Sequence, residues 1–136
     1  MQITGLKSKA NILADGCMFL TGGILYVGIE ILWRGYSHWS MALAGGICFT
    51  VFGKIWDKVK NLKRIYIPII GAGIITSVEF VFGLIFNKIL KMHVWDYSDM
   101  PFSFLGQICV LFSTLWGLLS IVVFPTAGKL YSKMIN

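Results

Sequence analysis

The sequence predicts an all-α integral membrane protein with four transmembrane helices. Hydrophobic residues make up 57% of the chain, charged residues only 13%, and the mean hydropathy is +0.76, which does not describe a soluble domain of 136 residues. The apolar runs are continuous, whereas the strands of a membrane β-barrel alternate apolar and polar residues over about ten positions. A chain of this length builds one small bundle, so we expect a single domain over residues 1–136.

Four apolar runs are long enough to cross the hydrocarbon core of a bilayer, which takes about 20 helical residues and at least ~17. They lie at about residues 17–33, 39–56, 65–86 and 102–124. Basic residues precede the first run, but no small-residue cleavage site follows it, so we interpret it as a retained span. Lys54 interrupts the second run, where a long side chain near a helix end can reach the headgroups.

Basic residues are distributed unequally between the two sides of the predicted bundle. Arg34, Lys88 and Lys91 flank the spans on one side. The other side holds Lys7, Lys9, Lys54, Lys58, Lys60, Lys63, Arg64, Lys129 and Lys133. The positive-inside rule therefore predicts that both termini and the middle loop are cytoplasmic. The two loops rich in aromatic and polar residues, around residues 35–41 and 94–101, then face outward.

The composition also indicates what the protein does not bind. The excess of 12 basic over 6 acidic residues is explained by cytoplasmic loops next to anionic headgroups, so we expect no nucleic-acid partner. Cys17, Cys48 and Cys109 are widely spaced in apolar surroundings, which predicts buried free thiols and neither a zinc site nor disulfides. No Gly-x-x-x-x-Gly-Lys-Ser/Thr loop is present, and we expect no cofactor.

The two halves of the sequence show a weak duplication. Val27-Gly28-Ile29-Glu30, Trp39-Ser40-Met41 and Gly45-Gly46-Ile47-Cys48 correspond to Ser77-Val78-Glu79-Phe80, to Trp95, Ser98 and Met100, and to Gly106-Gln107-Ile108-Cys109. Each unit would contain two spans, so the match predicts two tandem helical hairpins related by a pseudo-twofold axis along the membrane normal. Chance similarity between apolar helices is the alternative.

Two glutamates mark a polar layer inside the predicted bundle. At 1.5 Å per residue, Glu30 and Glu79 both lie ~20 Å from the inner edge of a ~30 Å core. A carboxylate at that depth costs a few kcal/mol unless it is paired or faces a wet cavity. Arg34, one helical turn after Glu30, is a favourable partner for it. For Glu79, the available cations on the outer side are Arg34, His38 and His93.

Two interpretations of this polar layer are open. In the first, Glu30, Arg34 and Glu79 form a buried cluster that only fixes the register of the helices. In the second, they belong to an outward-facing pocket for a small cationic or zwitterionic ligand, in which tryptophan rings also attract the positive charge. The candidate ligand-binding residues are Glu30, Arg34, His38, Trp39, Glu79, Trp95, Asp96, Tyr97, Ser98 and Asp99.

Several motifs together resemble a known family. They are Val94-Trp95-Asp96-Tyr97-Ser98-Asp99-Met100-Pro101-Phe102, Gly106-Gln107-Ile108-Cys109, Trp116-Gly117, Glu30 and Arg34-Gly35. The likeness, over roughly residues 25–125, is to small multi-span bacterial membrane proteins of the CmpB type, catalogued as ABC-transporter permeases. Members often have arginine where this chain has Gln107, and Gly-Pro-Tyr where it has residues 36–41. A role that needs the arginine is therefore not carried over.

Three classes of function follow from these observations. The favoured one is a membrane protein of the transport class, or a transporter subunit, acting as a homodimer or in a larger membrane complex. An intramembrane enzyme on lipid-linked substrates would use Glu30 or Glu79 as a base with His38 or Asp96 assisting, but no catalytic motif supports it. The third is a structural or regulatory partner of another membrane protein. A metal site at Asp96, Asp99 and a glutamate is conceivable, although loop aspartates more often cap a helix.

Overall fold

The protein is a bundle of four long helices. The computed structural model describes the backbone of residues 2–135 and the side chains of residues 11–135. The helices are α1 (Gln2–Arg34), α2 (Trp39–Val59), α3 (Tyr66–Phe82) and α4 (Val110–Ile135). A π-helical segment, η1 (Gly83–Ile89), continues α3, and the strands β1 (Ser103–Phe104) and β2 (Ile108–Cys109) pair antiparallel just before α4. The predicted all-α, four-helix fold class is confirmed.

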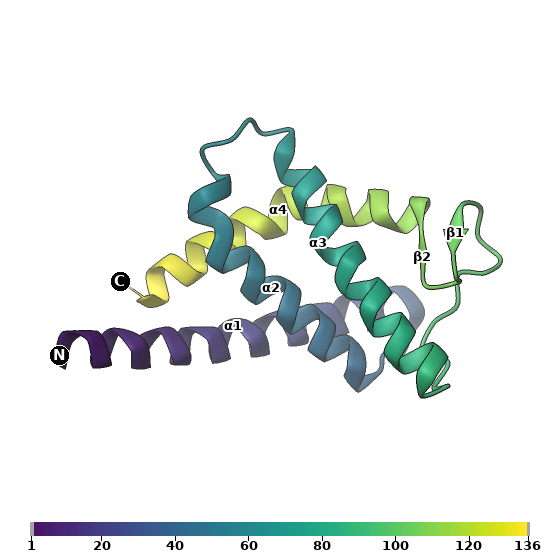
Figure 1. Ribbon diagram of the computed structural model, residues 1–136, viewed down its shortest axis with the longest axis horizontal. Coiled ribbons are helices and arrows are strands. Elements are labelled where there is room, and N and C mark those ends of the chain that lie inside the picture. Colours follow the sequence, from purple (N-terminus) through teal and green to yellow (C-terminus); the bar gives the residue numbers. More distant parts are fainter. Residues whose placement is uncertain (1, 136) are drawn as a thin grey trace.

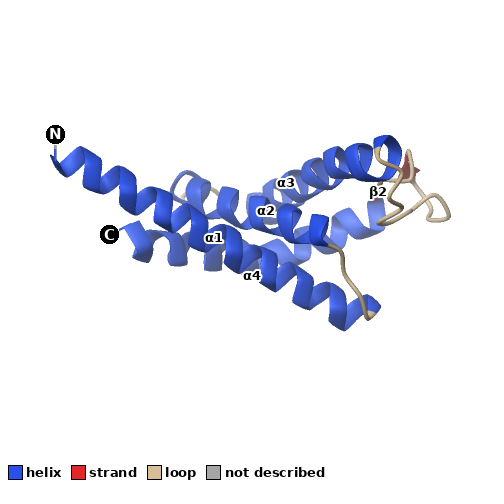
Figure 2. Cartoon of the chain, turned by 90° about the horizontal axis from the view of Figure 1, so that it is seen from below, coloured by secondary structure: helices blue, strands red, loops and turns tan. Residues whose placement is uncertain are grey.

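The helices pack as two hairpins that lie against each other. α1 packs on α2, α3 packs on α4, and α2 joins the hairpins through its contacts with α4 (Figure 1). The α2–α3 loop lies at one end of the bundle, and the α1–α2 loop lies at the other end with the β1–β2 hairpin (Figure 1). The first turns of α1 extend beyond the other helices (Figure 2).

Each of the four helices is long and apolar enough to cross a membrane. The spanning segments are Asn11–Arg34, Trp39–Val59, Tyr66–Ile89 and Val110–Ile135, so the chain is a multi-pass membrane protein. The prediction that the fourth span begins at residue 102 was wrong. Phe102, Leu105 and Gly106 have φ angles of 55°, 53° and 70°, which a right-handed helix does not contain, so α4 begins only at Val110.

Glycines allow the helices of each hairpin to approach closely. A Cβ on Gly22 of α1 would lie 2.6 Å from the carbonyl oxygen of Gly45 on α2, inside van der Waals contact. On α3, a Cβ on Gly71 would overlap the side chain of Ser120 on α4. Gly73, two residues later, has no described atom within 4 Å of such a Cβ. Gly71, not Gly73, is therefore the close-contact glycine of α3.

Apolar side chains fill two clusters, one towards each end of the bundle. In the half next to the α2–α3 loop, Phe52 of α2 stacks on Phe124 of α4 with ring centroids 4.5 Å apart. The second cluster lies under the loop between η1 and α4, residues 90–109, here called the outer loop after its predicted side of the membrane. There Met41 packs against Val94 and Trp95. The three cysteines are free, as predicted. Cys48 and Cys109 are buried, but the expectation that Cys17 is buried was wrong, since it is exposed on α1.

The structure supports only part of the predicted duplication. The two helical hairpins are present, and each first helix carries one of the two glutamates. The Gly-x-Ile-Cys match has no structural counterpart, because residues 45–48 are helical within α2 whereas residues 106–109 form the turn and second strand of the β-hairpin. The pseudo-twofold axis stays a prediction.

A pair of alanine substitutions tests the packing of α3 on α4. We expect Gly71→Ala to lower the free energy of unfolding by about 1–3 kcal/mol, because the added methyl group overlaps Ser120. Gly73→Ala is the matched control, and it should leave stability unchanged or raise it by up to about 1 kcal/mol through its better helix propensity. Thermal unfolding in a mild detergent measures both. Equal destabilisation by the two variants would contradict this packing.

Candidate functional site

A buried pair of amides anchors the long outer loop, residues 90–109, to the bundle. Asn87 of η1 donates through Nδ2 to Oε1 of Gln107 at 2.8 Å. Its Oδ1 accepts the backbone N–H groups of Val94 and Trp95, at 2.7 and 3.4 Å. The indole N–H of Trp95 donates to the carbonyl of Gln107 at 3.0 Å, and the Gln107 amide donates to the carbonyl of Leu105 at 2.8 Å. The two amides therefore fix the middle of the loop.

The outer loop crosses over itself where Tyr97 passes Gly106. The N–H of Tyr97 donates to the carbonyl of Gly106 at 2.7 Å. Gly106 has φ +70°, and a Cβ there would lie 2.9 Å from Oδ1 of Asp96, so only glycine fits this crossing without strain. Asp96 accepts the N–H of Ser98 at 2.9 Å, and the hydrogen bonds from Ser98 hold the pKa of Asp96 below its usual value. The crossing directs Tyr97 into the bundle.

The side chain of Tyr97 reaches the polar layer that the sequence predicts. Its ring stacks on Phe112 of α4, with centroids 4.9 Å apart and planes 12° apart. Its hydroxyl donates to Oε2 of Glu79 at 3.1 Å. Burial, together with the adjacent Glu79 carboxylate, raises the pKa of Tyr97 above its usual value. Tyr97 thus remains a neutral hydrogen-bond donor to Glu79.

Glu79 is buried and held by two neutral donors. Its side chain lies on α3, the residue is 7% exposed, and Oε2 also accepts the indole N–H of Trp116 at 3.2 Å. Oε1 is buried without a hydrogen-bond partner among the described residues. The expectation that Arg34, His38 or His93 pairs with Glu79 was wrong, since no ion pair to Glu79 is present in the described part of the chain.

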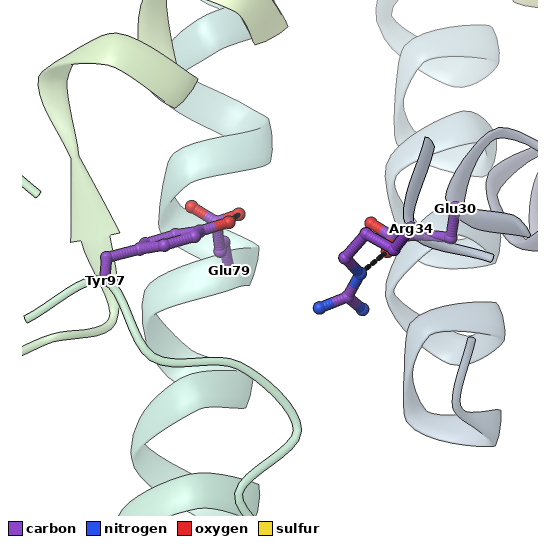
Figure 3. Close-up of polar contacts among 4 residues, drawn as sticks. All are labelled: Glu30, Arg34, Glu79 and Tyr97. Carbon is purple, nitrogen blue, oxygen red and sulfur yellow. Dashed lines mark hydrogen bonds and ion pairs between the residues drawn. The ribbon is translucent and has the colours of Figure 1, made fainter. Parts of the chain in front are cut away.

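Glu30 and Arg34 form the ion pair that their spacing predicts. Nε of Arg34 lies 2.5 Å from Oε2 of Glu30, one turn apart on α1. The contact is electrostatic, because neither atom has an aligned hydrogen-bond partner in residues 11–135. The Arg34 guanidinium also lies over the ring of Tyr36, 4.8 Å from its centroid. Figure 3 shows the guanidinium directed towards the side of the bundle that carries Glu79 and Tyr97. Its Nη2 is buried and has no hydrogen-bond partner among the side chains and backbone that the structure describes.

A cavity of about 240 Å³, here called the α1–α4 cavity, lies beside these groups. It is lined by Ile29, Glu30, Trp33, Arg34, Met41, Tyr97, Phe112, Leu115, Trp116 and Leu119. A second cavity of about 160 Å³ adjoins it through Ile29, Trp116 and Leu119 and is almost wholly apolar. Glu79 lies behind Tyr97 and Trp116, beside a small space of about 10 Å³, close to the volume that one water needs.

The structure brings half of the predicted site residues together. Glu30, Arg34 and Tyr97 line the α1–α4 cavity, and Glu79 is bonded to Tyr97. Trp95 lines the small space beside Glu79. These five residues come from α1, α3 and the outer loop, so the site is assembled by the fold of the bundle and not by one motif.

The other five predicted residues line neither the α1–α4 cavity nor the small space beside Glu79. His38 is the N-cap of α2, where its Nδ1 accepts the N–H of Ser40 at 3.2 Å. Trp39 is 57% exposed and meets Phe86 edge to face. The remaining three, Asp96, Ser98 and Asp99, are exposed on the outer loop. Neither aspartate caps a helix, since α4 begins only at Val110.

The geometry offers little for a metal ion or for acid–base catalysis. Within the described residues, no group of three or more His, Cys, Asp or Glu side chains is placed to hold a metal ion. His38 bonds to Ser40, and Asp96 bonds to Ser98. Neither therefore assists a glutamate in the way that the enzyme hypothesis requires.

Sequence reasoning missed three residues that organise the site. Trp116 lies in an apolar run, where a tryptophan gives no sign that its N–H meets a carboxylate 37 positions away. Asn87 and Gln107 could have been recognised from the sequence as polar contacts, because an amide at the edge of an apolar span needs hydrogen-bond partners. Pairing the two, 20 residues apart, required the fold.

Replacing Asn87 tests whether the amide pair holds the outer loop. Asn87→Ala removes the acceptor of the Val94 N–H and the donor to Gln107, so we expect a loss of about 2–4 kcal/mol of unfolding free energy. Hydrogen exchange at residues 94–97 should also accelerate. Asn61→Ala, at an exposed position in the α2–α3 loop, is the control and should change neither quantity. Unchanged exchange in Asn87→Ala would show that other contacts fix the loop.

Comparison with known proteins assigns the family. The family described as "Putative ABC-transporter type IV" matches residues 50–136, from within α2 to the end of the chain. That region contains Glu79, Tyr97 and Trp116, whereas Glu30 and Arg34 precede it. Neither the curated proteins nor the solved structures gave a significant match. The matched region is well over half of the chain, so the protein belongs to this ABC-transporter family of the CmpB type.

Proposed function

We propose that this protein acts in membrane transport by binding an amphiphilic organic cation or zwitterion in the α1–α4 cavity. The observation that carries the proposal is the arrangement of Glu79. Its carboxylate is held by two neutral donors, Tyr97 and Trp116, and both of these side chains line the cavity. A carboxylate buried behind the wall of a cavity attracts positive charge into that cavity.

The charges around the cavity favour a positive ligand group. Glu30 and Arg34 neutralise each other, whereas an ionised Glu79 has no cationic partner among the described residues. Arg34 also has a buried Nη2 that meets no hydrogen-bond partner in the described part of the chain. A zwitterion would supply a partner to both groups, with its cation towards Glu79 and its anion on Arg34.

The walls of the cavity favour a ligand with an apolar part. Besides Glu30 and Arg34, the lining consists of aliphatic, thioether and aromatic side chains. Trp33, Tyr97 and Trp116 are among the lining residues, and aromatic rings attract quaternary ammonium groups. The adjoining apolar cavity extends the space along α1 and α4. An alkylammonium or a zwitterionic headgroup with its chain matches this combination.

We assign the transport class from the family, and we infer where the transport path lies from the small size of the bundle. The two adjoining cavities beside the Glu30–Arg34 pair, of about 240 and 160 Å³, leave little room for a continuous channel through one copy. A path between two copies, or between this chain and a larger membrane component, is the arrangement that we favour. The sequence carries no phosphate-binding loop, so an ATP-driven transporter would take its ATPase from another subunit.

Binding of hexyltrimethylammonium tests the proposed ligand class. The wild-type protein in a neutral detergent should bind this cation at least tenfold more tightly than hexyl sulfate. Glu79→Gln removes the attracting charge and should weaken cation binding at least tenfold, as should Leu115→Trp, which fills the cavity. Isothermal titration calorimetry measures all three.

Two controls separate binding from folding. Leu111→Trp lies one turn from Leu115 on an exposed part of α4 and outside the cavity, so it should bind the cation as the wild type does. Thermal unfolding of Glu79→Gln distinguishes a site from a structural cluster. Lower stability with unchanged affinity would mean that Glu30, Arg34 and Glu79 only fix the helix register, and would refute the proposal.

We further propose that the site faces outward from the bacterial cytoplasmic membrane, with both termini in the cytoplasm. The end of α2 and the α2–α3 loop carry Lys58, Lys60, Lys63 and Arg64, whereas the outer loop carries Lys91 together with Asp96 and Asp99. In a Cys17→Ser background, Ser98→Cys should react with a membrane-impermeant maleimide in intact cells. Asn61→Cys should react only after permeabilisation. The reverse pattern would invert the orientation.

A further inference from the structure

A second polar cavity lies at the other end of the bundle, independent of the α1–α4 cavity. It has a volume of about 610 Å³ and opens between the end of α2, the α2–α3 loop and the middle of α4. Its lining is Trp56, Lys60, Leu62, Arg64, Ile65, Ile67, Pro68, Ile121 and Pro125. Two basic side chains therefore meet a wall that is otherwise apolar.

The positive charge of this cavity is poorly compensated. Arg64 is exposed and has no ion pair among the described residues. Lys60 lies 3.1 Å from Asp57, but both side chains are exposed, and such surface pairs are weak. Residues 57–64 contain one acidic and four basic side chains, a net charge of +3. The loop thus offers several cations to an anionic ligand.

The start of α3 adds to the excess of positive charge at this cavity. α3 begins at Tyr66, two residues after Arg64, and its first turn contains no acidic residue. The N-terminal end of a helix carries partial positive charge, so basic side chains there are electrostatically unfavourable. The N–H groups of Tyr66 and Ile67 already donate to the carbonyls of Lys63 and Arg64. An anion at this position would relieve the repulsion mainly through the basic side chains.

The apolar wall identifies the kind of anion. Trp56, Ile121 and Pro125 belong to helices that are long and apolar enough to span a membrane, so we expect this part of the cavity to face the hydrocarbon region. A free inorganic anion would leave that wall uncovered, whereas a lipid covers it with an acyl chain. Basic pockets between spanning helices near the membrane surface are suited to anionic headgroups. We propose that this cavity binds one anionic phospholipid, with its phosphate at Lys60 and Arg64 and its chain along Ile121 and Pro125.

Native mass spectrometry of the full chain released from neutral detergent tests the lipid site. With palmitoyl-oleoyl phosphatidylglycerol and phosphatidylcholine at equal concentration, the wild type should retain phosphatidylglycerol at least fivefold more often. Arg64→Gln should lower the retained phosphatidylglycerol at least fivefold. Lys63→Gln, which removes the same charge one residue outside the cavity, should lower it less than twofold.

A second pair of variants keeps the charge constant. Ile121→Trp fills the cavity and should lower lipid retention at least fivefold, whereas Val122→Trp, on an exposed position outside the cavity, should leave it unchanged. Equal losses in Arg64→Gln and Lys63→Gln would show a diffuse attraction and overturn the site. Displacement of the lipid by an equal concentration of inorganic phosphate would overturn the assignment to a lipid.

Discussion

The buried carboxylate of Glu79 is the constraint on which the outer half of the molecule depends. A carboxylate inside a membrane-spanning helix is tolerated only if the fold supplies donors or water. The bundle supplies the Tyr97 hydroxyl from the outer loop and the Trp116 indole from α4. Glu79 therefore ties three elements together, α3, α4 and the loop between them. One of its oxygens is left without a partner in the described part of the chain.

The outer loop serves this arrangement through a series of contacts. Asn87 and Gln107 hold its middle, Gly106 lets it cross itself, and the crossing points Tyr97 towards Glu79. Across the α1–α4 cavity, the Glu30–Arg34 pair presents charge from the end of α1. The polar groups thus gather on one side of an otherwise apolar space. Such a space suits a ligand with one charged end and one apolar end, which is the basis of the proposed transport function.

Local signals in the sequence predict the helices better than they predict the site. The four spans and the Glu30–Arg34 pair follow from apolar runs and a spacing of one turn, and the structure confirms both. The start of α4 does not follow from the sequence in the same way. Residues 102–109 are mostly apolar, yet they contain positive φ angles that hydropathy does not reveal. The hydrogen-bond partners of Glu79 could not be predicted from the sequence either. Tyr97 and Trp116 are 18 and 37 residues away, and tertiary packing alone brings them to it.

The most direct test of the account follows the indole N–H signals of the five tryptophans by NMR. During titration with hexyltrimethylammonium in neutral micelles, the signals of Trp33 and Trp116, which line the α1–α4 cavity, should shift and saturate. The signal of Trp56, at the other end of the bundle, should not. In Glu79→Gln the shift of Trp116 should disappear. A uniform shift of all five signals, or none at Trp116, would contradict a cation site built around Glu79.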